Sequence, residues 1–196
     1  MRYRADITAG ALMIPERRVV ADMLISGINR QEWHVAIFER NVLQARRTET
    51  ARRLARLIRS RLARMDGELW RLVRDGASDT ATHAVLAAAV KHSRLLGDFL
   101  DLVVREQYRI FARALSNPLW DQFLDDCRGR DPDMPVWAES TRIRLRSSVF
   151  QILAQTGCID NTRAKTLQTV HLASQVTVYL AKNNESYVLR CIQVAP

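Results

Sequence analysis

Arginine is the residue type whose number and spacing point most directly to chemistry in this 196-residue chain. Of its 30 basic residues, 27 are arginine and only 3 are lysine. The segment from Asn41 to Met65 contains one acidic residue, Glu49, and eight arginines: Arg46, Arg47, Arg52, Arg53, Arg56, Arg59, Arg61 and Arg64. A guanidinium presents forked donors that match phosphate oxygens and the edge of guanine. This segment therefore indicates contact with a polyanion.

Sequence motifs for catalysis are missing. The chain contains no G-x-G-x-x-G, G-x-x-x-x-G-K-[ST] or G-x-S-x-G, and its four histidines form no H-E-x-x-H pair. The densest acids, Asp125-Asp126 and Asp131-x-Asp133, have no lysine nearby to complete a metal-dependent nuclease site. Helix caps and solvated faces explain these acids better. We expect no enzyme activity, no cofactor and no metal site.

The composition is typical of a globular, helix-rich protein in a reducing compartment. Apolar residues make up 47% of the chain, and the low counts of 7 glycines and 5 prolines argue against a β-sandwich or barrel. Three widely spaced cysteines do not form a disulfide framework. The longest apolar run, Ala84–Val90, is far shorter than the roughly 20 residues of a membrane span, and no signal peptide is recognisable. We expect a cytoplasmic protein that does not enter a membrane.

The arginine-rich segment predicts an amphipathic helix. Thr48 can serve as its N-cap, with Glu49 in the first turn, and Asp66-Gly67 is expected to end it. Apolar residues recur at spacings of three and four: Ala51, Leu54, Ala55, Ile58, Leu62 and Met65. Arg52, Arg56 and Arg59 form a second stripe away from the apolar one.

Two helices are expected before it. Pro15 begins one that runs to Ser26-Gly27, and Asn29–Glu32 resembles a capping box that opens the next. Two helices, a tight connection and an arginine-rich helix follow the order of a helix-turn-helix motif. Residues 1–75 are therefore predicted to form a basic, helix-turn-helix-like unit.

The rest of the chain predicts a helical middle, residues 76–135, and a small basic unit, residues 136–196. The middle should contain helices from Ser78 or Asp79 to Lys91, from Arg94 to Ala114 and from Asn117 to Arg128. The final unit should contain a helix from Ser140 or Thr141 to Thr156, a short β-hairpin from Cys158 to Val170, a helix over Leu172–Ala181 and a strand over Tyr187–Val194. A basic helix followed by a hairpin is the arrangement of a winged helix. The fold class expected is mainly α.

Charge is distributed unevenly over these units. Residues 1–75 hold 16 basic and 9 acidic residues, residues 76–139 hold 7 and 10, and residues 140–196 hold 7 and 2, for a net charge of +9. Two basic ends thus flank an acidic middle. The residues predicted to contact DNA are Arg46, Arg47, Thr48, Thr50, Arg52, Arg53, Arg56, Arg59, Arg64, Arg142, Arg144, Arg146, Arg163 and Lys165. Thr50 and Arg53 lie near enough to the helix start to reach base edges, and Arg163 and Lys165 would lie on the wing.

Several short strings, taken in order, resemble the BrxA family, the small component of BREX bacteriophage-resistance systems. The strings are Tyr3–Gly10, Ile14–Arg17, Thr50–Arg53, Leu69–Gly76, Lys91–Phe99 and Tyr187–Cys191. The resemblance covers nearly the whole chain. It implies a role in phage defence beside a DNA methyltransferase, an ATPase and a phosphatase-like protein, and it brings no catalytic motif.

These observations predict a non-catalytic protein that binds double-stranded DNA through arginine-rich helices. An assembly adaptor, whose basic faces dock onto acidic BREX partners, is the alternative from another class. RNA is a third possibility, although Trp33, Trp70, Trp120 and Trp137 lie mostly among apolar neighbours and are read as core rather than as stacking platforms.

Overall fold

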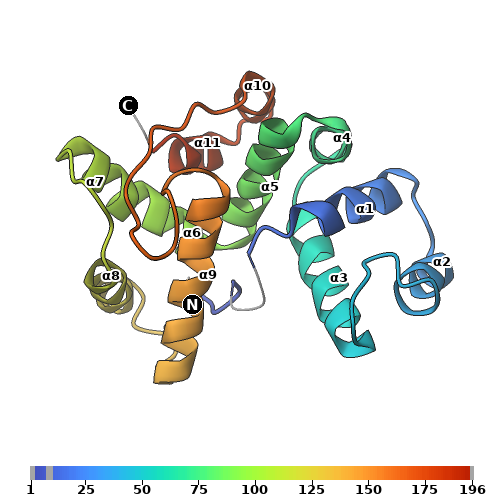
Figure 1. The fold of residues 1–196 in the computed structure, drawn as a ribbon, viewed down its shortest axis with the longest axis horizontal. Helices are drawn as coiled ribbons and strands as arrows, with labels where there is room; N and C mark the ends of the chain where they lie inside the picture. The colour runs from blue at the N-terminus through green and yellow to red at the C-terminus, as the bar shows by residue number, and fades with distance from the viewer. Residues whose placement is uncertain (1–2, 8–10, 195–196) are drawn as a thin grey trace.

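The structure, a computed structural model, describes residues 3–7 and 11–194, which fold into helices joined by turns and by one long connection over residues 156–173 (Figure 1). Residues 8–10 of the N-terminal string quoted above lie outside the described residues. Two stretches are π-helical and carry the label η. The order is α1 Ile14–Ile25, α2 Arg30–His34, η1 Val35–Glu39, α3 Thr48–Leu62, α4 Gly67–Asp75, α5 Ser78–His92, α6 Arg94–Phe99, η2 Leu100–Val104, α7 Arg105–Arg109, α8 Asn117–Arg130, α9 Glu139–Gln155, α10 Ser174–Lys182 and α11 Ser186–Ile192.

The first helices begin close to where the sequence places them. Pro15 lies in the first turn of α1. Asn29 forms the expected capping box, since its side chain accepts from the backbone of Gln31 and Glu32 while the Glu32 carboxylate accepts from the Asn29 amide. At α3 the N-cap is Arg47 rather than Thr48, and no side chain caps it. The basic residue at this cap leaves α3 without the hydroxyl cap that the sequence suggested.

Helix α4 is absent from the sequence-based prediction. Asp66-Gly67 does not end α3, which already stops at Leu62; Asp66 instead caps α4 by accepting from the amides of Glu68 and Leu69 at 2.9 and 3.2 Å. Leu69 and Val73, one turn apart, bury one face of this helix. Aspartate is favoured at the N-cap of a helix, and glycine is favoured just after a helix ends, so Asp66-Gly67 fits either role. In the structure this pair begins α4.

The middle of the chain supplies the centre of the fold. Helix α5 is buried along most of its length. Helices α6, η2 and α7 follow one another without a break and end at Arg109, five residues before the predicted end at Ala114. Rings from three helices pack edge to face here, with Phe99 4.9 Å from Trp120, 5.2 Å from Phe123 and 6.4 Å from Phe150 between centroids. One buried cluster runs from Tyr3 to Val194. The three predicted units thus share a core, and their independence stays a prediction.

The C-terminal region contains helices α9, α10 and α11 and a non-helical stretch over residues 156–173. Two isolated antiparallel bridges involve this stretch, Ala114 with Thr166 and Ile159 with Leu167, and no longer strand forms in the described residues. The hairpin and the winged-helix arrangement therefore remain predictions. The strand predicted over Tyr187–Val194 is wrong, because these residues contain α11. Val188, Cys191 and Ile192 are spaced three and four apart and bury one helical face, which outweighs their β-branched character.

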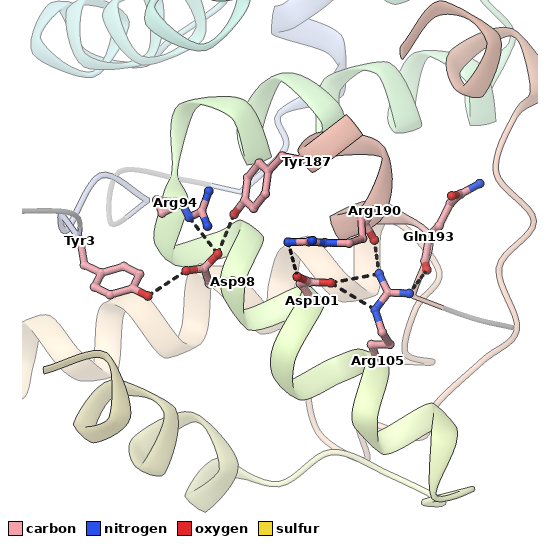
Figure 2. A network of polar contacts seen from close by, with 8 residues as sticks. All are labelled: Tyr3, Arg94, Asp98, Asp101, Arg105, Tyr187, Arg190 and Gln193. Atoms are coloured by element: carbon pink, nitrogen blue, oxygen red, sulfur yellow. Dashed lines mark hydrogen bonds and ion pairs between the residues drawn. The ribbon is translucent and has the colours of Figure 1, made fainter. Parts of the chain in front are cut away.

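Buried Asp98 ties both ends of the chain to α6 (Figure 2). The hydroxyls of Tyr3 and Tyr187 each donate to its carboxylate at 2.8 Å, and Arg94 forms an ion pair with it at 2.9 Å. Arg94 also lies over the Tyr187 ring, 3.9 Å from the centroid. The approach of Tyr187 needs Gly97, since a Cβ there would overlap the tyrosine hydroxyl.

Asp101 provides a second anchor one turn further along (Figure 2). Its carboxylate oxygens form ion pairs with guanidinium nitrogens of Arg105 at 3.2 Å and of Arg190 at 2.9 Å. Arg105 also donates to the backbone carbonyls of Arg190 and Gln193 at the end of α11. The carboxylates of Asp98 and Asp101 hold α11 against α6 and η2, so Arg94, Arg105 and Arg190 contribute ion pairs to the fold.

Candidate nucleic-acid interface

Helix α3 presents two different faces. Its buried side consists of Ala51, Ala55, Leu57, Ile58, Arg61 and Leu62, which pack against the rest of the N-terminal helices and α5. Its other side carries the exposed residues Arg52, Arg53, Arg56 and Arg59. The amphipathic pattern predicted from the sequence is confirmed in outline. It differs in that Leu54 is only half-buried, while Leu57 and Arg61, outside the predicted stripe, are buried.

A groove of about 720 Å³ runs along one flank of this arginine face. One wall is α3 with the residue before it, and the opposite wall is the N-terminal segment together with the end of α5. The first wall includes Arg47, Glu49, Thr50, Arg53 and Arg56, and the second includes Asp6 and His92. With Arg52, which also lines it, the groove gathers five of the predicted contact residues into one place.

A second cleft, of about 440 Å³, lies on the other flank of α3. The guanidinium of Arg59 stacks over Trp33, 4.7 Å from the ring centroid, and that of Arg52 lies 5.4 Å from the centroid of Phe38. Arg52 and Arg56 line both openings, so they form the ridge between them. Trp33, interpreted from the sequence as core, is half-buried beside the basic face. No sequence pattern signals this contact, which joins helices about 26 residues apart.

The arginines of this surface differ in how far their charge is neutralised. Arg52 pairs with Glu49 at 2.9 Å, with both side chains exposed. Within residues 3–7 and 11–194, no acidic side chain forms an ion pair with Arg46, Arg47, Arg53 or Arg56. Their charges face solvent without a paired acid from the described residues. Such uncompensated guanidiniums are suited to phosphates.

His92 separates this groove from a neighbouring opening lined by Arg4, Lys91 and Arg94. Its Nδ1 accepts a hydrogen bond from Nε of Arg64 at 3.2 Å. Burial, together with the charges of Arg61 and Arg64, lowers the pKa of His92 to about 4. The ring is therefore neutral at pH 7, and Arg64, although exposed, is already held by a protein acceptor.

Two further arginines of the N-terminal half are structural. Arg17 and Arg61 are each 1% exposed and both donate to the carbonyl of Ala11, at 3.0 and 2.9 Å. Burial lowers the pKa of Arg61 to about 10, so that it keeps its charge at neutral pH. Arg61 therefore belongs to the core, although the sequence counts it among the eight arginines of this segment.

The C-terminal arginines have a different setting on α9. Arg146 pairs with Asp121 of α8 at 3.1 Å, and Arg142 lies between Asp121, Asp125 and Glu139 at 3.5 to 3.9 Å. Only Arg144 of this set is exposed without an ion pair in the part of the chain that the structure describes. Figure 1 shows that α9 and α3 lie apart from one another in the fold.

Arg163 and Lys165 lie on the turn that follows α9. Asp160 organises this turn by accepting from the amides of Asn161 and Thr166. Arg163 is exposed, whereas Lys165 is half-buried, 5.3 Å from the centroid of the Phe150 ring, and donates to the carbonyl of Arg163 at 3.3 Å. The turn thus presents one free guanidinium.

Together these features define a helical protein with an arginine-rich face. No group of three histidine, cysteine or acidic side chains converges to hold a metal ion among the described residues. Over the same residues, none of the helices combines the length and apolarity needed to cross a bilayer.

Comparison with known proteins gives the family. Residues 1–184 match the BrxA family. The chain is 50% identical to the BREX protein BrxA of Paramagnetospirillum magneticum (strain ATCC 700264 / AMB-1), over 99% of this chain and 98% of that protein. It is 28% identical to the BREX protein BrxA of Escherichia coli O9:H4 (strain HS), over 96% and 88%. The chain belongs to the BrxA family, as the resemblance in its sequence implied.

A solved structure shares the fold. The crystal structure of an uncharacterized protein from Magnetospirillum magneticum superposes with a TM-score of 0.92 at 48% identity, and the match covers all of both chains. The helical arrangement described above is therefore that of a crystallised relative.

Proposed function

We propose that this BrxA-family protein is a non-catalytic component of a BREX phage-defence system that binds double-stranded DNA through α3. The single observation that carries the proposal is the set of four exposed arginines, Arg46, Arg47, Arg53 and Arg56, that have no ion-pair partner in the described part of the chain. A surface meant only for solubility usually interleaves acids with bases. Here the charge is left open to an external anion.

The contacts divide into two kinds. Arg46, Arg47 and Arg56 hold backbone phosphates, and Arg52 and Arg59, stacked on Phe38 and Trp33, add two more. Arg53 and Thr50 lie one turn inside α3 and line the groove, where base edges come within reach. Because most of these contacts are to phosphates, binding depends weakly on sequence.

The C-terminal contacts in the proposal are weaker. Arg142 and Arg146 would have to exchange Asp121 for a phosphate, which costs an existing ion pair. Arg144, Arg163 and Lys165 remain as a minor second contact with DNA. The predicted units thus contribute unequally, with residues 1–75 supplying most of the affinity.

The experiment is a binding titration of the purified chain against duplex DNA, duplex RNA and single strands over a range of salt concentrations. If about six phosphates are neutralised, log K for duplex DNA falls with log salt at a slope of about −5. Absence of binding at low salt, or a slope near zero, would overturn the proposal. Tighter binding to duplex RNA would indicate the RNA alternative. Salt-sensitive association with acidic BREX partners, without binding to DNA, would indicate the adaptor alternative.

A further inference from the structure

The turn that ends α7 has an unusual residue at its critical position. The amide of Phe111 donates to the carbonyl of Tyr108 at 3.1 Å, and the amide of Ala112 donates to that of Gln107 at 2.9 Å. This pair of bonds is the Schellman motif that closes many helices. Its left-handed position, usually glycine, is occupied by Phe111 with φ of 53°. A bulky side chain is strained in this conformation.

The same side chain is almost fully exposed. Phe111 is 91% accessible to solvent, more than any other large hydrophobic residue that the structure describes, and its neighbour Ile110 is 59% accessible. Core packing therefore explains neither the strain nor the choice of residue. A strained, exposed aromatic at a position where glycine would fit better points to a role outside the fold. In Figure 1 the end of α7 lies at the opposite end of the molecule from α3.

The surroundings of Phe111 are basic. The backbone of Arg113 accepts from the amide of Leu167 at 3.0 Å, which aligns the turn that carries Arg163 with the segment after Phe111. Both acids of this tip are already engaged: Glu106 pairs with Arg109 at 2.9 Å, and Asp160 accepts two backbone amides. In the residues described, neither Arg113 nor Arg163 has an ion-pair partner, and both are exposed.

We infer that Phe111, supported by Ile110, is a wedge that inserts between stacked base pairs of duplex DNA, with Arg113 and Arg163 on the flanking phosphates. The inference rests on the proposed function, because it takes the same ligand. Apolar side chains inserted between base steps unstack and kink the duplex, and pyrimidine–purine steps yield most easily. The exposure of Phe111 together with the exposed arginines Arg113 and Arg163 favours DNA over an apolar pocket on another protein.

The test uses the full chain and 2-aminopurine placed at pyrimidine–purine steps along a duplex. Binding of the parent protein raises the fluorescence of the probe several-fold as the base unstacks. Phe111→Gly abolishes this rise while the affinity, measured by anisotropy, falls by no more than about threefold, because α3 still holds the phosphates. Its melting temperature does not fall and is expected to rise by about 2–4 °C as the strain is relieved.

Two controls keep the result interpretable. Phe111→Asn gives a second variant without the ring, because asparagine also adopts the left-handed conformation readily. Val178→Ala removes apolar surface from an exposed residue of α10 and should leave the fluorescence rise unchanged.

Three outcomes overturn the wedge. First, if the parent protein binds duplex DNA without a rise in fluorescence, the wedge is wrong and the proposed function stays intact. Second, the wedge is wrong if the rise in fluorescence is undiminished with Phe111→Gly or Phe111→Asn. Third, it is wrong if either substitution abolishes association with a purified BREX partner while the rise persists. If the parent does not bind DNA at all, the proposed function and the wedge fail together.

Discussion

The arginines of α3 and those of α9 are alike in sequence and opposite in setting. Both sets lie near the start of an amphipathic helix, and both are dense in arginine with few acids beside them in the chain. On α3, Arg53 and Arg56 face solvent, whereas on α9, Arg142 and Arg146 are neutralised by α8. The difference comes from the neighbouring element: α8 supplies Asp121 and Asp125 to α9, whereas no acid of the described residues forms an ion pair with Arg53 or Arg56 of α3.

The number of arginines along a stretch of sequence is therefore a poor measure of the positive charge that a ligand encounters at the folded surface. The acidic middle of the chain compensates one basic end and not the other. The energetic consequence is also unequal. The α9 pairs are partly shielded from solvent and add to stability, while the charges of α3 contribute little to the fold and are available to an external anion.

The largest loss of DNA affinity is expected from substitutions in α3 itself. Arg53→Glu with Arg56→Glu should reduce the affinity for duplex DNA by at least about a hundredfold at low salt, because two phosphate contacts are replaced by repulsion. Both residues lie away from the buried stripe, so circular dichroism should be unchanged. A doubly reversed protein that binds like the parent would remove α3 from the interface.

A change confined to the core should separate stability from binding. Gly97→Ala displaces the Tyr187 hydroxyl from buried Asp98 and costs about 2 kcal/mol of unfolding free energy. This corresponds to a fall in Tm of about 4–8 °C. The salt dependence of DNA binding should not move, since neither basic set is touched. An unchanged Tm would show that the Asp98 anchor is not needed for the fold.

Removing the acid that neutralises the α9 arginines should leave their charge open to DNA, as it is on α3. Asp121→Asn removes the acid shared by Arg142 and Arg146, and we expect duplex affinity to rise by about two- to fivefold with a slightly steeper salt slope. The loss of these partly exposed pairs costs roughly 1 kcal/mol of stability or less. A variant with unchanged affinity would mean that α9 cannot reach DNA even when its charge is free.

The smallest expected effect concerns His92 beside the groove. Its pKa is lowered to about 4 in the fold, against 6.5 for the free side chain, so the neutral form is favoured by folding. The stability it contributes is fully present above pH 6.5 and is lost as pH falls toward 4, by on the order of 1 kcal/mol after allowance for its partial exposure. His92→Gln should flatten this part of the pH–stability curve measured by urea unfolding. A curve identical to that of the parent would contradict the lowered pKa.

Local signals predicted much of the fold. Periodicity and caps located α1, α3, α5, α8, α9 and α10 to within a few residues, and the capping box at Asn29 is confirmed. The errors arose where one signal had two meanings: Asp66-Gly67 starts α4 rather than ending α3, and Phe111 ends a helix without a glycine. The spacing of Val188, Cys191 and Ile192 was overlooked beside their β propensity.

The candidate site was only partly predictable. The exposed face of α3 follows from its period, because buried residues repeat every three or four positions. The stacking of Arg59 on Trp33 and the closing of the groove by Asp6 and His92 depend on contacts between distant segments, which no local pattern encodes. The ion pairs of Arg142 and Arg146 with α8 were out of reach for the same reason.

The central claim is that free arginines, and not arginines as such, bind DNA. The most direct test compares the salt dependence of duplex binding for two matched double variants, Arg53→Ala with Arg56→Ala and Arg142→Ala with Arg146→Ala. We predict that the first makes the slope of log K against log salt shallower by about 2, and that the second leaves it within experimental error of the parent. Equal changes in the two slopes, or a larger change from the α9 pair, would contradict the account.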